Sequence, residues 1–189
     1  MAIHPLPGDV LLVARRPTLR SFLAGPTGWF VSWRIRRRTG KAWNHVATFS
    51  SASTVVEADG TAVVQRPIVE YLAAPWKFRL GIVRMPDHPG LPYTSAATVN
   101  REAASAFVRG QLGARYDRRT VLALWFASVL WGPDGIRRVV QSSDGGWICS
   151  ELAVGAWAAG HVSGATAEAY PCPGSFADRH PVHEVAGSL

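Results

Sequence analysis

Short runs of apolar residues, bounded by glycine, serine or proline, divide much of the first half of the chain into segments of strand length. Runs rich in valine, isoleucine, leucine and phenylalanine are typical of β-strands. The pattern predicts five strands, at residues 9–14, 45–49, 54–58, 62–65 and 78–85. The small residues Ser50, Ser51 and Ala52 form a turn between the second and third, which are therefore expected to pair as an antiparallel hairpin.

Apolar residues that recur at helical spacing predict several helices. They are expected within residues 18–38 and at residues 68–73, 95–110, 118–131 and 148–159. The proline-rich residues 85–92 are expected to form a loop without regular structure. The tail from Pro171 onward is expected to be extended or partly disordered.

The composition is that of a single folded domain. The chain has 189 residues, of which 48% are hydrophobic, and no internal repeat or linker divides residues 1–189. Such a chain can bury a core without a disulfide or a metal. Its two cysteines, Cys149 and Cys172, lie in dissimilar contexts and do not suggest a disulfide. Because no Cys/His cluster has zinc spacing, and the pair His180 and His183 is more typical of a surface, no metal or cofactor is expected.

Cys149 stands where a loop rich in glycine and serine, residues 141–146, gives way to the apolar helix predicted at residues 148–159. At the start of a helix, unpaired backbone N–H groups and the positive end of the helix dipole favour a thiolate over a thiol. A lone cysteine can also be a small buried apolar residue. The placement makes Cys149 a candidate nucleophile if a base lies near it.

His45 is the candidate base, and Glu57 is its candidate partner. If the hairpin turns near Ser51, two residues face each other when their numbers sum to about 102. The numbers of His45 and Glu57 sum to 102, so these two residues are expected to face each other. A carboxylate beside the imidazole holds one tautomer, so that the other ring nitrogen can face a sulfur. The alternatives are a half-buried strand histidine and a solvated strand carboxylate.

The order of these motifs resembles a known family, the circularly permuted papain-like amidases, which are YiiX-like relatives of the NlpC class of cell-wall endopeptidases. The resemblance rests on Pro-Gly-Asp-Val-Leu-Leu (residues 7–12), Asn-His-Val (44–46), Val-Glu-Ala (56–58), Tyr-Asp (116–117) and Cys-Ser-Glu-Leu (149–152). It implies an α+β fold, in which a small antiparallel sheet or open barrel packs against helices that include the cysteine-bearing helix. It also implies Cys149 as nucleophile, His45 as general base and Glu57 as the orienting residue.

The expected reaction is attack by the Cys149 thiolate on the carbonyl of an amide, such as a peptidoglycan peptide or a related acyl-amide, followed by hydrolysis of the thioacyl intermediate. The backbone N–H of Cys149 is expected to bind the oxyanion. Tyr116, by the resemblance, and Asn44 are candidate second donors, and Ser150 completes the oxyanion and substrate-binding set. Tyr116 is equally compatible with a packing role and Asn44 with a turn.

A basic, tryptophan-rich insertion at about residues 15–41 departs from the family pattern. The formal net charge is +7, and positive charge is concentrated at Arg34, Arg36, Arg37, Arg38 and Lys41. Such a segment predicts contact with an anionic membrane or wall polymer, although a solvated basic helix explains the same pattern. Nucleic acid is not expected, because no nucleic-acid-binding motif accompanies the charge.

The amino terminus lacks the pattern of a signal peptide, and the longest apolar run, residues 121–131, is too short to span a membrane. A cytoplasmic or virion-associated protein is therefore expected. Two other functions stay open. One is a lipid-directed thiol acyltransferase or esterase at a membrane surface, and the other is a non-catalytic binding module on the same fold.

Overall fold

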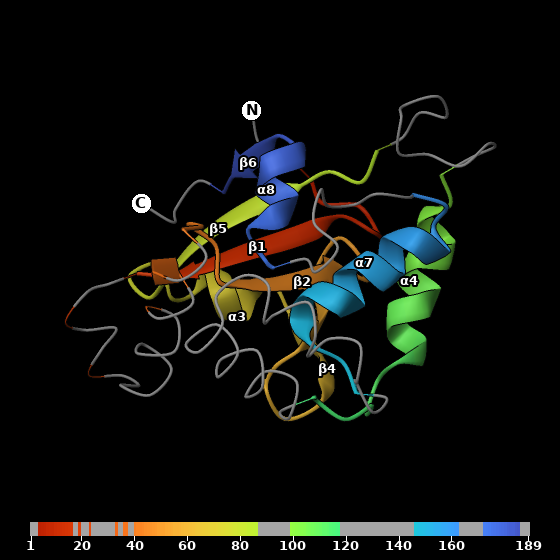
Figure 1. The fold of residues 1–189 in the computed structure, drawn as a ribbon, viewed down its shortest axis with the longest axis horizontal. Helices are drawn as coiled ribbons and strands as arrows, with labels where there is room; N and C mark the ends of the chain where they lie inside the picture. The colour runs from red at the N-terminus through yellow and green to blue at the C-terminus, as the bar shows by residue number, and fades with distance from the viewer. Residues whose placement is uncertain are drawn as a thin grey trace, which may run out of the picture.

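The computed structural model describes residues 4–16, 40–86, 99–117, 146–162 and 172–185, together with the single positions 19, 23, 33, 36 and 37. The helix predicted at residues 118–131 lies outside the described residues, as do most of the helix within residues 18–38 and most of the proline-rich loop. The described part is an α+β structure in which one antiparallel sheet carries helices (Figure 1).

The six strands of the sheet lie in the order β4-β3-β2-β1-β5-β6, and every neighbouring pair is antiparallel. Their bounds are β1 (Val10–Arg15), β2 (His45–Phe49), β3 (Thr54–Ala58), β4 (Val63–Pro67), β5 (Phe78–Val83) and β6 (Val182–Glu184). The predicted bounds of β2 and β3 are confirmed. The ends of β1, β4 and β5 lie within two residues of the predicted positions.

The helices among the described residues are α3 (Val69–Leu72), α4 (Arg101–Gly110), α7 (Cys149–Ala159) and α8 (Ser175–Arg179). The prediction that α4 extends back through residues 99 and 100 is wrong, because the side chain of Asn100 accepts a hydrogen bond from the backbone N–H of Ala103 at 2.9 Å and caps the helix there. In Figure 1, α4 and α7 lie beside each other, and they pack together in the structure.

The described residues 172–185 of the tail contain a helix, α8, which was not expected, and an extended segment, β6. β6 pairs with the outer edge of β5, through Gly81 with Glu184 and Ile82 with His183. A Cβ at Gly81 would lie 2.5 Å from Val182, so glycine permits this close approach. The sequence does not reveal such a strand, because its partner is about a hundred residues away along the chain.

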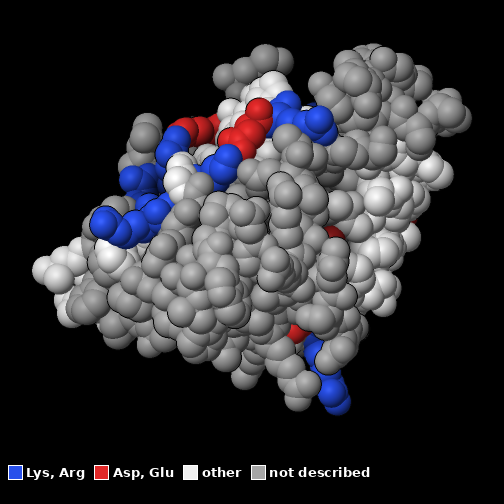
Figure 2. Space-filling view, viewed as in Figure 1, with Lys and Arg blue, Asp and Glu red and all other residues white. Residues whose placement is uncertain are grey.

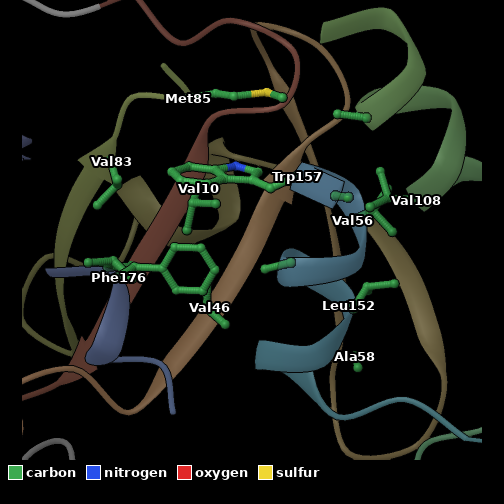
Figure 3. Packing of buried hydrophobic residues seen from close by; sticks show 14 of the residues in the cluster. Val10, Val46, Val56, Ala58, Val83, Met85, Val108, Leu152, Trp157 and Phe176 are labelled. Carbon is green, nitrogen blue, oxygen red and sulfur yellow. The ribbon is translucent and has the colours of Figure 1, made fainter. Parts of the chain in front are cut away.

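Two hydrophobic clusters occupy the two faces of the sheet, because side chains alternate along each strand. The α7 cluster contains Val10, Leu12 and Val46 with the buried side chains of α4 and α7. Within it, Figure 3 shows the rings of Trp157 and Phe176 close to Val10; their centroids are 5.3 Å apart in an edge-to-face contact.

The second group, the Tyr71 cluster, packs the opposite face of the sheet against α3. Its buried members are Leu11, Val13, Ala47, Phe49, Val55, Tyr71, Leu80 and Ile82. The ring of Tyr71 also meets Phe78 edge-to-face, with centroids 5.2 Å apart. The middle strands are thus covered on both faces.

Asp9 joins the amino-terminal loop to β5 and α4. Its carboxylate is fully buried and accepts hydrogen bonds from the Met85 backbone N–H at 3.0 Å and from Arg101 at 2.7 Å, and it pairs with Arg84 at 3.2 Å. The preceding Gly8 has a φ of +83°, a backbone conformation that glycine adopts without strain. This geometry explains why Gly-Asp begins the first strand.

Replacing Asp9 by alanine should destabilise the fold by about 3 kcal/mol, because it leaves the two partly buried arginines without their carboxylate. Urea unfolding of the purified protein measures this as a lower midpoint. The matched control is Glu102→Ala, which removes an exposed ion pair with Arg109 and should change stability by less than about 1 kcal/mol. Equal losses in the two variants would contradict a special role for the buried pair.

Candidate active site

Cys149 is the first residue of α7, one residue after the predicted start of the helix at residue 148. Ile148 precedes it in an extended conformation, and Glu151 accepts a hydrogen bond from the Ile148 backbone N–H at 3.4 Å. Cys149 is half-buried against the α7 cluster. The thiol therefore lies at the positively polarised end of a helix that the core holds in place.

The predicted register of the hairpin that carries His45 and Glu57 is wrong by two residues. Thr48 pairs with Val56, so residues whose numbers sum to 104, rather than 102, face each other. The cause is the turn, in which the backbone N–H of Ser50 donates to the carbonyl of Thr54 at 3.0 Å. Because side chains alternate with a period of two, this shift leaves every side chain on its expected face.

His45 and Glu57 therefore meet as diagonal neighbours rather than as a facing pair. Nε2 of His45 lies 2.5 Å from Oε2 of Glu57. The Glu57 side chain is 2% exposed and that of His45 is 22% exposed. The imidazole is thus partly open to solvent, while the carboxylate that orients it is buried.

The three candidate residues reach one another where β2 and β3 separate. The pairing between these strands covers Thr48 with Val56 and ends there, so His45 and Glu57 lie beyond it. Glu57 is bound on the side of the Tyr71 cluster, whereas Cys149 packs against the α7 cluster. Nε2 of His45 bonds to Glu57, and the Cys149 side chain interacts with His45 strongly enough to raise the pKa of its imidazole. Since Nε2 bonds to Glu57, Nδ1 is the nitrogen available for the sulfur.

The surroundings of His45 favour its charged form. Burial by itself lowers the pKa of His45, but hydrogen bonds to the Cys149 side chain and to the Glu57 carboxylate outweigh it and raise the pKa to about 10. For the carboxyl group of Glu57, burial acts in the opposite direction and raises the pKa. The hydrogen bond to His45 outweighs this effect, so the pKa of Glu57 lies below its ordinary value. The pair therefore exists as imidazolium and carboxylate at neutral pH.

Two further residues hold Glu57, and the sequence analysis missed both. Nε of Arg66 donates to Oε1 at 2.8 Å, and the hydroxyl of Tyr71 donates to Oε2. The facing residue of Glu57 in β4 is Val64, so Arg66 is its diagonal neighbour. The strand predicted at residues 62–65 ends before Arg66, so this contact was not predicted. Nothing local indicated Tyr71, which belongs to α3.

The remaining candidate site residues are Tyr116, Ser150 and Asn44. Tyr116 is close to the thiol: burial raises the pKa of its hydroxyl, and the neighbouring Cys149 side chain raises it further. Ser150 follows Cys149 in α7 and is buried. The side-chain oxygen of Asn44 accepts a hydrogen bond from the Arg15 backbone N–H at 3.0 Å, which ties β2 to β1.

The predicted basic surface is described in part, since Arg34 and Arg38 lie outside the described residues. The guanidinium of Arg37 stacks 5.6 Å from the ring centroid of Trp33, and Arg36 is half-buried. Lys41 forms an ion pair with Asp178. In the view of Figure 2, the basic side chains of the described residues that gather along the upper left lie next to acidic ones.

Comparison with known proteins supports the fold. The chain is similar to the crystal structure of the metalloprotein YiiX from Escherichia coli O157:H7, with a TM-score of 0.50 and 16% sequence identity, over 84% of this chain and 67% of that one. No family model and no curated protein matches the sequence. At this level of identity the likeness concerns the fold, and it supports the YiiX-like part of the resemblance noted in the sequence.

The described residues contain neither a cluster of metal ligands nor a membrane-spanning helix. Within the described ranges, no group of three or more His, Cys, Asp or Glu side chains is arranged to hold a metal ion. Among the helices of the described residues, none combines the length and the apolar character needed to cross a bilayer.

The raised pKa of His45 predicts a pH-dependent contribution to stability. A histidine with a folded-state pKa of about 10 and an unfolded value near 6.5 stabilises the fold fully below pH 6.5, and loses this contribution as the pH rises through 10. The difference in unfolding free energy between the wild type and His45→Gln should therefore shrink between pH 6.5 and pH 10. Urea unfolding at several pH values measures it; a constant or growing difference would contradict the charge assignment.

Proposed function

We propose that this protein is a cysteine hydrolase that cleaves an amide bond through a permuted papain-like site. Cys149 is the nucleophile, His45 the general base and acid, and Glu57 the orienting residue. The observation that carries the proposal is the position of His45, whose Nε2 bonds to a buried carboxylate and whose imidazole interacts with a cysteine at the start of a helix. That arrangement is the one a thiol nucleophile needs.

In the first half of the proposed reaction, the thiol proton of Cys149 is held by His45, which is then an imidazolium, and Sγ attacks the carbonyl carbon as a thiolate and forms a tetrahedral intermediate. Its C–N bond then breaks, and the imidazolium of His45 gives its proton to the leaving amine. The raised pKa of His45 keeps that proton available at neutral pH. The products of this half are a free amine and a thioester on Cys149.

In the second half, neutral His45 takes a proton from water, whose oxygen attacks the thioester. The C–S bond then breaks, which releases a carboxylic acid and restores the Cys149 thiolate beside the His45 imidazolium. The negative oxygen that forms in each half needs donors. The backbone N–H of Cys149 supplies one, since the first N–H groups of a helix have no partner within it. The Tyr116 hydroxyl is the proposed second donor.

A metal does not fit this site as described. YiiX is described as a metalloprotein. Here, however, Oε1 of Glu57 accepts from Arg66, and Oε2 accepts from both His45 and Tyr71. The lone pairs that would bind a cation are thus directed at hydrogen-bond donors, and no step of the proposal passes through a metal.

An acyltransferase or esterase at a membrane surface is the second candidate. It would use the same thioester but would pass the acyl group to another acceptor, or act on lipid esters. Leu19 and Leu23 favour it, because they are 74% and 70% exposed, four residues apart, in the basic insertion. Co-sedimentation with vesicles that contain an anionic lipid tests it, and tight binding would favour this candidate.

The proposed site predicts the reactivity of Cys149 toward iodoacetamide. His45→Ala should slow labelling at pH 7 by about tenfold or more, because the imidazolium no longer stabilises the thiolate. Glu57→Gln should slow it less, because His45 remains. Peptide mass spectrometry follows Cys149 and Cys172 in the same sample, and Cys172, whose sulfur lies 3.2 Å from Ser175 Oγ, should be unaffected.

The matched control is His183→Ala, which removes an exposed histidine of β6. Its labelling rate should equal that of the wild type. If Cys149 labels no faster than Cys172, and His45→Ala changes nothing, the hydrolase proposal fails and a binding module on the same fold takes its place. If labelling behaves as predicted, amide and thioester substrates can be screened with Cys149→Ala as the inactive reference.

A further inference from the structure

Glu57 is a charged group in the interior of the sheet, and every oxygen of its carboxylate is engaged. Oε1 accepts from Arg66, and Oε2 accepts from both His45 and the Tyr71 hydroxyl. The side chain is 2% exposed, so water cannot replace these donors. A buried carboxylate that lost a donor would either turn toward another partner or take up a proton.

The two donors other than His45 come from different elements, and each is held in place. Tyr71 projects from α3 into the Tyr71 cluster, where its ring is buried. Arg66 is 38% exposed and is fixed at its outer end by ion pairs with Asp59 at 2.8 Å and with Glu70 at 3.4 Å. A planar guanidinium can hold several carboxylates in fixed directions, which an ammonium group cannot do as well.

We propose that Tyr71 and Arg66 are positioning residues, which hold Glu57 in the orientation that directs Nε2 of His45 toward it and Nδ1 toward Cys149. This inference rests on the proposed function, because it assigns a role to groups that never touch the substrate. They act on the sulfur through two hydrogen-bonded residues, Glu57 and His45.

The same contacts determine which group carries the proton. The hydrogen bond from Tyr71 and the positive charge of Arg66 both lower the pKa of Glu57, in addition to the effect of His45. Glu57 thus stays ionised, and the shared proton stays on His45, which also faces Cys149. Asp59 acts on Glu57 through Arg66 and is itself ionised, with a pKa lowered to about 2 despite the opposing effect of burial.

The test compares Tyr71→Phe and Arg66→Gln with the wild type. Phenylalanine keeps the buried ring and removes the hydroxyl. The carboxyl ¹³C signal of Glu57 is followed by NMR as the pH is lowered, and the acid side of the pH profile of Cys149 labelling is recorded in parallel. Both variants should show a higher pKa for Glu57 and a labelling profile shifted toward higher pH. The variant with the larger increase in the pKa of Glu57 should also show the larger shift of the labelling profile.

Glu70→Gln is the matched control, because it removes only a charge at the exposed end of Arg66, while the closer ion pair with Asp59 and the contact between Arg66 and Glu57 are kept. It should leave the Glu57 titration unchanged. An unchanged titration in both test variants, or an equal shift in the control, overturns the inference; a shift in one test variant alone overturns the role of the other residue.

The titration needs no substrate, so it separates this inference from the proposed function. If Glu57 shifts as expected but Cys149 remains unreactive at every pH, the hydrolase proposal fails while the positioning of Glu57 stands. If Cys149 is reactive and depends on His45, but Glu57 does not respond to either variant, the positioning role fails alone. Far-UV circular dichroism of each variant confirms that the compared proteins are folded.

Discussion

The buried carboxylate of Glu57 is the constraint around which the site is arranged. A charge inside a sheet is stable only when donors surround it, and here they come from β2, β4 and α3, through His45, Arg66 and Tyr71. These donors fix the relative positions of three elements around one side chain. The orientation of His45, and with it the geometry at Cys149, follows from that arrangement.

The separation of β2 from β3 makes the arrangement possible. A continuous ladder would keep the two faces of the sheet apart, with Cys149 on the side of the α7 cluster and Tyr71 on the opposite side. Because pairing between these strands ends at Thr48 and Val56, an imidazole at the end of β2 can bond to groups on both sides. The buried hydrophobic clusters hold the helices rigidly enough for a reacting thiol.

A second buried carboxylate, Asp9, plays a structural role at the other end of β1. Both Asp9 and Glu57 are paired with arginine, yet the partners of Asp9 include backbone N–H groups and no histidine. A buried charge alone therefore does not define a site. What distinguishes Glu57 is the titratable imidazole between it and a cysteine at the start of a helix.

The sequence by itself determined the local elements: strands where apolar runs meet turn residues, and a helix that begins within one residue of Cys149 after a loop rich in glycine and serine. It also indicated His45 and Glu57, because hairpin pairing depends on nearby residues. Only the tertiary structure decided the addition of β6 to β5 and the contact of Tyr71 with Glu57. The physical reason is that local propensities and alternation act over a few residues, whereas a buried carboxylate finds its partners wherever packing brings donors to it.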